Sequence, residues 1–133
     1  MIRILHIDHV VLRTSRLAEM TAFYCEVLGC EVERELPAEI GLTQLRAGAA
    51  LIDLVDVDSR LGRTGGAAPG DTGRNLDHLC LQIETMEASE LANWLERHGV
   101  PSGAIETRYG AKGFGPSMYI QDPEGNTVEL RFS

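Results

Sequence analysis

Four residues of types that bind metal ions each stand in a short segment of alternating apolar residues. Such alternation is typical of a β-strand with one buried face. In each segment one face is purely apolar, and the opposite face holds an imidazole or a carboxylate: His9, Asp53, His78 and Glu129. Both groups are ligands for divalent transition metals. A solvated sheet face would also carry polar residues, so the pattern leaves a metal site and a wet face both open.

The two histidines lie in an internal repeat. Ile7–Leu12 (IDHVVL) matches Leu76–Leu81 (LDHLCL), and each segment is followed by a helical pattern that ends at a glycine. Glycine just after a helix adopts the left-handed backbone at little cost. The helices are expected over Arg16–Leu28, before Gly29, and over Thr85–His98, before Gly99. Their expected N-terminal caps are Thr14 or Ser15 and Thr85.

Strand patterns follow each helix, which predicts two β-α-β-β-β modules of an α+β fold. The expected strands are Cys30–Glu35, Ile40–Arg46 and Ala50–Val57 in the first half, and Ala104–Arg108, Ser117–Gln121 and Thr127–Phe132 in the second. Residues 58–74 are rich in glycine and contain Pro69, a composition typical of a linker or a mobile loop. We expect one domain over residues 1–133, with module one at 1–57, a linker at 58–74 and module two at 75–133.

The composition excludes several classes of function. The chain has 133 residues, is 44% hydrophobic and carries a net charge of −8. No basic face is visible, which argues against binding to nucleic acid, and no apolar run is long enough to span a membrane. The three cysteines form no disulfide pattern and read as reduced thiols. Together with the absence of a secretory signal, this makes a cytoplasmic location the expectation.

These segments resemble the vicinal-oxygen-chelate superfamily, which includes glyoxalase I, methylmalonyl-CoA epimerase, extradiol dioxygenases, and fosfomycin- and bleomycin-resistance proteins. The resemblance rests on both histidine segments, on FYCEVLG at Phe23–Gly29 and on DPEGNTVEL at Asp122–Leu130. It covers nearly the whole chain apart from the linker. It implies a cupped mixed sheet with the helices on its outer face.

The resemblance also implies a ligand set and its chemistry. In such proteins the ligands lie on the first and last strands of each module, which here gives His9, Asp53, His78 and Glu129. Two nitrogens and two oxygens leave two positions open for a substrate with neighbouring oxygens, on one Ni, Mn, Fe, Co or Zn ion. A homodimer whose sites are shared between chains is implied, although some relatives close the site within one chain. Asp53 departs from the glutamate of glyoxalase I and from the glutamine of the epimerase.

Four further residues are candidates for substrate binding. The resemblance to glyoxalase I suggests Arg13 for a substrate carboxylate, and Lys112 on a mobile loop formed by the glycine-rich stretch Gly110–Gly115. Arg108 could line the entrance to the site. Cys80 shares a face with His78, where it would line the pocket or act as a small buried filler. For Arg13 a surface arginine, and for the glycine-rich stretch a simple connection, are the competing interpretations.

The leading hypothesis is a metal-dependent lyase or isomerase that moves a proton next to a carbonyl, with Glu129 as the base and Asp53 as the second choice. An Fe(II) dioxygenase using His9, His78 and Glu129, or a thiol-transferring resistance enzyme, is the alternative of a different reaction class. A drug-binding protein of the bleomycin-resistance type is the non-enzymatic alternative. The content of aromatic residues, 5%, and the filled ligand positions argue against it.

Overall fold

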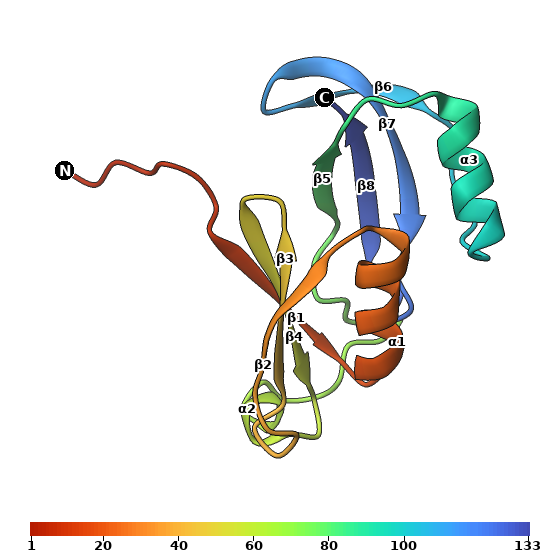
Figure 1. Cartoon of the computed structure of the whole chain (residues 1–133). Helices are drawn as coiled ribbons and strands as arrows, with labels where there is room; N and C mark the ends of the chain where they lie inside the picture. Colours follow the sequence, from red (N-terminus) through yellow and green to blue (C-terminus); the bar gives the residue numbers. More distant parts are fainter. The chain divides into compact units, whose positions relative to one another are not determined.

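The computed structural model describes residues 1–133 and has the α+β architecture that the sequence predicts. The chain divides into two compact units, Met1–Asn75 and Leu76–Ser133. Each unit holds one four-stranded mixed sheet built from a β-α-β-β-β module (Figure 1). None of the helices combines the length and the apolar character that crossing a bilayer requires.

The first unit has the strand order β1-β4-β3-β2. Strand β1 pairs in parallel with β4, and the other two pairings are antiparallel. Its elements are β1 (His9–Thr14), α1 (Leu17–Ala22), a π-helical turn η1 (Phe23–Val27), β2 (Glu31–Glu35), β3 (Leu42–Ala47) and β4 (Ala50–Asp56). The helix expected over Arg16–Leu28 is therefore present, but its second half is wound more widely than an α-helix.

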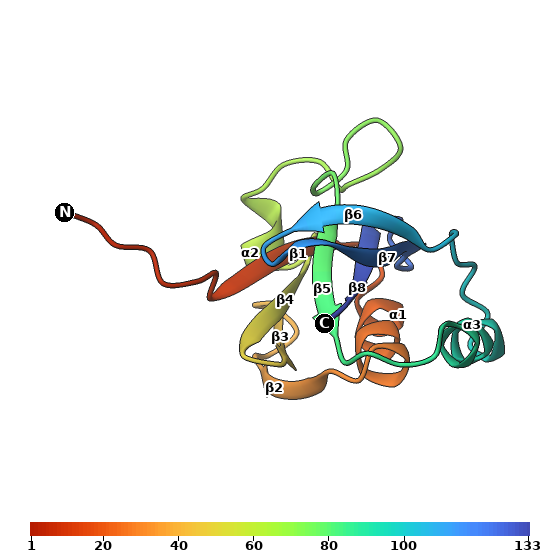
Figure 2. The ribbon, with the colours of Figure 1, turned by 90° about the horizontal axis from the view of Figure 1, so that it is seen from above.

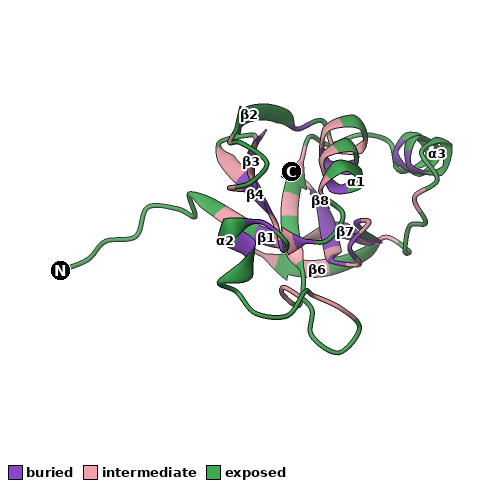
Figure 3. Cartoon of the chain, turned by 90° about the horizontal axis from the view of Figure 1, so that it is seen from below, coloured by how far each residue is buried: buried purple, intermediate pink, exposed green.

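The core of the first unit comes from alternate positions, as expected. Leu12 in β1 and Ile52 and Leu54 in β4 are buried, and so are Met20 and Tyr24 on the helical segment. Strand β4 is buried on both faces, because Asp53 and Val55 are also covered (Figure 3). Residues 1–8 carry no helix or strand and extend away from β1 as an exposed arm (Figure 2).

The second unit repeats this topology with the strand order β5-β8-β7-β6, and β5 pairs in parallel with β8. Its elements are β5 (Leu79–Ile83), α3 (Ala88–Arg97), β6 (Glu106–Gly110), β7 (Gly113–Gln121) and β8 (Thr127–Phe132). Strand β7 begins four residues before the expected Ser117. The glycine-rich stretch 110–115 is therefore not a free loop, because it forms the turn and flanks of a hairpin in which Gly110 pairs with Gly113.

Both expected helix caps are wrong, and the hydroxyls make other bonds. The N-cap of α1 is Arg16 and that of α3 is Glu87, and neither side chain caps its helix. The Thr14 hydroxyl oxygen accepts from the Arg16 N–H at 2.9 Å, but Thr14 lies two residues before the N-cap position. The Thr85 hydroxyl donates to the carbonyl of Ser133 at 2.6 Å and ties the end of β5 to the C-terminus.

The segment expected as a linker, 58–74, belongs with the first unit and is partly ordered as a helix. It contains α2 (Arg60–Arg63), whose N-cap Ser59 accepts the Gly62 N–H at 3.1 Å. A bridge between Gly70 and Gly73 closes a turn further along. The composition of this segment does not predict α2, because only the N-cap residue Ser59 distinguishes the helix from a glycine-rich loop.

Gly62 is required by close packing of α2 against the end of β4. A Cβ at this position would lie 1.9 Å from the Asp56 carbonyl oxygen, whereas a Cβ at Gly73 would meet nothing within 4 Å. We therefore expect Gly62→Ala to lower the free energy of unfolding by about 1–3 kcal/mol, and Gly73→Ala to leave it nearly unchanged. Urea denaturation measures both. Equal midpoints for the two variants would contradict this packing.

Candidate metal centre

The first unit positions His9 and Asp53 on neighbouring parallel strands. His9 begins β1, where it is paired with Leu51, and Asp53 is paired with Val11. Asp53 is only 3% exposed, whereas the His9 side chain is about half exposed. The pKa of His9 is raised, first by its hydrogen bond to Asp8 and then by the negative charge of Asp53. The carboxylates of Asp8 and Asp53 therefore create a negative electrostatic potential at His9 that favours a cation.

One oxygen of Asp53 is held and the other is free. Gln44 in β3 donates its Nε2 to Asp53 Oδ2 at 3.1 Å, and Arg34 donates to Gln44 Oε1 at 2.7 Å, which fixes the amide. Asp53 Oδ1 is buried and has no hydrogen-bond partner. An unsatisfied buried carboxylate oxygen is costly, about 1–3 kcal/mol or more. A bound cation would remove that cost, so this donor fits a metal.

The second unit brings His78 and Glu129 together. Glu129, in β8, is 5% exposed, and its Oε1 lies 3.3 Å from His78 Nε2. Two ligands that each lie about 2.0–2.2 Å from one ion are separated by about 3.0–3.4 Å. The spacing of this pair is therefore that of two neighbouring ligands. His78 Nδ1 is bonded to Asp77 at 2.7 Å. With Nδ1 as the donor of that bond, Nε2 of a neutral ring carries the lone pair that a metal ion between His78 and Glu129 would use.

Each unit thus supplies one histidine–carboxylate pair. Within the structure no group of three or more His, Cys, Asp or Glu side chains is arranged to hold a metal ion. Both pairs arise in the same way, because the first strand of each module lies beside the last.

Arg13 forms hydrogen bonds with backbone groups of its own unit. Its guanidinium donates to the carbonyls of Gly62, Gly66 and Ala67 at 2.8–3.0 Å. Gly65 lies so close that a Cβ there would be 2.5 Å from Arg13 Nε, and this buried Nε has no acceptor. In this structure Arg13 therefore binds backbone carbonyls of the segment 62–67, which use three of its five N–H groups.

The other three substrate-binding candidates lie in the second unit in different environments. Arg108 donates to the carbonyl and hydroxyl of Ser117 and covers the Tyr119 ring at 4.1 Å. Lys112 lies in the exposed two-residue turn between β6 and β7. Cys80 is exposed rather than a buried filler, and partial burial and the Glu129 charge raise its pKa.

Sequence reasoning missed two residues of this face. Arg131 is two positions after Glu129 in β8 and is 5% exposed, and it donates to the carbonyls of Arg108 and Gly113. Tyr119 pairs with Glu129 across β7 and β8, and its ring meets the His78 ring at 5.7 Å. Strand alternation from Glu129 could have found Arg131, but nothing in the sequence pairs Tyr119 with His78.

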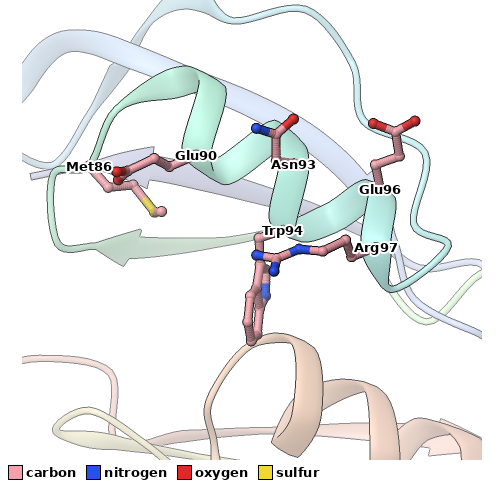
Figure 4. Close-up of a pocket in the computed structure, with 6 residues that line it drawn as sticks. All are labelled: Met86, Glu90, Asn93, Trp94, Glu96 and Arg97. Atoms are coloured by element: carbon pink, nitrogen blue, oxygen red, sulfur yellow. The ribbon is translucent and has the colours of Figure 1, made fainter.

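A cavity of about 850 Å³ lies along α3 (Figure 4). Trp94 projects from the helix beside Arg97, whose guanidinium lies 5.6 Å from the indole centroid. No histidine–carboxylate pair lines this cavity: its walls are Met86, Glu90, Asn93, Trp94, Glu96 and Arg97. It therefore adds nothing to the candidate metal centre.

Residues 6–130 match the model of the Glyoxalase/Bleomycin resistance protein/Dioxygenase superfamily. The chain belongs to this superfamily. It is 31% identical to biphenyl-2,3-diol 1,2-dioxygenase 3 of Rhodococcus globerulus over 126 residues, which are 92% of this chain and 60% of that enzyme. Biphenyl-2,3-diol 1,2-dioxygenase 2 of the same organism is 30% identical with the same coverage. The superfamily member described here thus spans about 60% of the length of these relatives.

Solved structures of the superfamily fold agree with this membership. An integron cassette protein from the mobile metagenome of V. cholerae, VCH_CASS1, matches with a TM-score of 0.76 and 27% identity, over 99% of this chain and 98% of that one. Lactoylglutathione lyase from Agrobacterium tumefaciens matches with a TM-score of 0.67 and 27% identity, over 96% and 93%. The fosfomycin resistance protein FosX from Listeria monocytogenes, at 20% identity, shares the fold.

Loss of the Arg13 guanidinium should release the segment 62–67. We expect Arg13→Met to speed trypsin cleavage after Arg60 or Arg63 about fivefold or more, because about 1 kcal/mol of local hydrogen bonding is lost. Arg3→Met, in the exposed arm, is the matched control and should leave the rate unchanged. Cleavage is followed by mass spectrometry, and an unchanged rate in the Arg13 variant would show that the segment does not depend on it.

Proposed function

We propose that this protein is a metal-dependent enzyme in which His9, Asp53, His78 and Glu129 bind one divalent ion. Its substrate is a small molecule whose neighbouring oxygens chelate that ion. The observations that carry the proposal are the buried Asp53 Oδ1, which has no hydrogen-bond partner, and the 3.3 Å between His78 Nε2 and Glu129 Oε1, which is the spacing of two neighbouring ligands. We further propose a homodimer that shares its sites between chains.

The departure at Asp53 is compatible with a ligand role. Because Gln44 occupies Oδ2, the carboxylate can offer Oδ1 alone. Burial of Asp53 and its anchored amide partner restrict its motion, which partly offsets the shorter side chain. A site with four protein ligands supports proton transfer next to a carbonyl as the reaction, as in glyoxalase- and epimerase-type enzymes.

The chain's residues divide the work of this reaction. When bound, the metal would act as a Lewis acid on the substrate oxygens. Glu129 removes the proton from the neighbouring carbon and returns it, and Asp53 is the second choice for this role. Both carboxylates are largely buried, which limits competing reactions with bulk water.

Metal content tests the site directly. We expect the purified protein to carry close to one transition-metal ion per chain, and His78→Ala to lose it, because the Glu129 pair is then incomplete. His98→Ala is the control, since His98 follows α3 and contacts Trp94. Elemental analysis of the three proteins, before and after reconstitution, gives the answer. Wild-type protein that binds no metal would contradict the proposal.

A second candidate is an Fe(II) ring-cleaving dioxygenase that uses His9, His78 and Glu129. The two curated relatives that bear a dioxygenase name favour it, and so does Tyr119, whose hydroxyl-bearing ring lies against His78. Asp53 would then be a buried acid near the site and not a ligand. The unpartnered Asp53 Oδ1 is why we rank this function second.

Dependence on oxygen separates the two reactions. We expect the metal-loaded protein to exchange deuterium from solvent into the carbon next to a substrate carbonyl without oxygen, and Glu129→Gln to lower this rate about 10²–10⁴-fold. Candidate substrates are a thiohemiacetal and an epimerisable carbonyl compound. Mass spectrometry follows the exchange. Oxygen uptake with a catechol after anaerobic reconstitution with Fe(II), and no exchange, would instead establish the dioxygenase.

A further inference from the structure

Both proposed histidine ligands make the same second hydrogen bond. His9 Nδ1 lies 2.6 Å from Asp8 Oδ1, and His78 Nδ1 lies 2.7 Å from Asp77 Oδ2. In each repeat the aspartate is the residue directly before the histidine. An ionised carboxylate only accepts hydrogen bonds, so Nδ1 must be the donor in both pairs. The neutral rings therefore carry their lone pair on Nε2.

Folding does not need these bonds. The side chains of Asp8 and Asp77 are 80% and 96% exposed, and each bond joins adjacent residues at the start of a strand. Exposed ion pairs of this kind contribute little to stability, because solvent screens them. Neither aspartate packs in the core. The recurrence of the pair in both modules is thus better explained by what it does to the imidazole ring.

We infer that Asp8 and Asp77 are positioning residues, which hold the two rings so that Nε2 of each faces the metal. This inference rests on the proposed function. Its geometry is visible in the second unit, where His78 Nε2 points at Glu129 Oε1 while Nδ1 is bound to Asp77. A carboxylate behind a ligating imidazole fixes its tautomer and strengthens it as a donor, and loss of such a partner lowers metal affinity about 10–100-fold.

The first readout needs no metal. In the metal-free, full-length protein at alkaline pH, nitrogen-15 NMR of the imidazole rings should show both His9 and His78 as the Nδ1–H tautomer. A histidine without an acceptor favours Nε2–H in water. Asp77→Ala should shift His78 alone, and Asp8→Ala should shift His9 alone. Glu31→Gln, which removes an exposed carboxylate from β2, should shift neither.

The second readout is the affinity for Co²⁺ or Ni²⁺, measured by titration together with the melting temperature. We expect each alanine variant to bind about 10–100-fold more weakly at an unchanged melting temperature. Asp77→Asn, which keeps an oxygen acceptor, should retain the tautomer and lose less affinity. Glu31→Gln should bind like the wild type.

The outcomes separate this inference from the metal site. Nε2–H rings in the wild type, or an unchanged affinity in both alanine variants, would overturn the positioning role while leaving the ligands in place. Wild-type protein that shows the Nδ1–H rings but binds no metal would overturn the proposed function, and the positioning role with it. Tautomer shifts confined to the expected ring, with weaker metal binding, would support both.

Discussion

In each unit the parallel pairing of the first strand with the last determines everything that follows at the candidate site. The pairing of β1 with β4 places His9 near Asp53, and that of β5 with β8 places His78 near Glu129. These residues are 44 and 51 positions apart in the chain. Because a parallel pair needs a crossover connection, the helix and the two intervening strands of each module are what close it.

The last strand of each module also carries a buried carboxylate, Asp53 in β4 and Glu129 in β8, and this arrangement suits the binding of a cation. Buried charges are unfavourable unless they are paired or coordinate a metal. Asp53 has an amide on one oxygen and no partner on the other, and Glu129 lies beside His78 Nε2 and the Cys80 thiol. Apolar residues at these two positions would avoid the cost of burying charge, so the two buried carboxylates favour a bound cation and support the proposed function.

Two arginines shape the surroundings of the pairs through backbone carbonyls. Arg13 binds the segment 62–67, and Arg131 binds the hairpin of β6 and β7. Gly65, Gly110 and Gly115 lie against these guanidinium groups, where a Cβ would come within 2.5–2.9 Å. The glycine-rich segments are therefore held by cations of the sheet rather than left as loops. This accounts for an ordered hairpin where the resemblance to glyoxalase I suggested a mobile loop.

The sequence by itself determined the repeat, the α+β class, most strand positions and the alternation that singles out His9, Asp53, His78 and Glu129, because these depend on local periodicity and on glycines that end helices. It also sufficed to place the chain in its superfamily. It failed at the helix caps, at α2 and at the β6–β7 hairpin, where competing local bonds or contacts from distant residues decide the outcome. Only the tertiary structure decided that Arg13 binds backbone carbonyls and that Arg131 and Tyr119 lie on the same sheet face as Glu129. It alone also decided that one oxygen of Asp53 has no partner and that an aspartate binds Nδ1 of each histidine. Those facts depend on which side chains meet after the strands pair, and spacing along the chain does not encode such meetings.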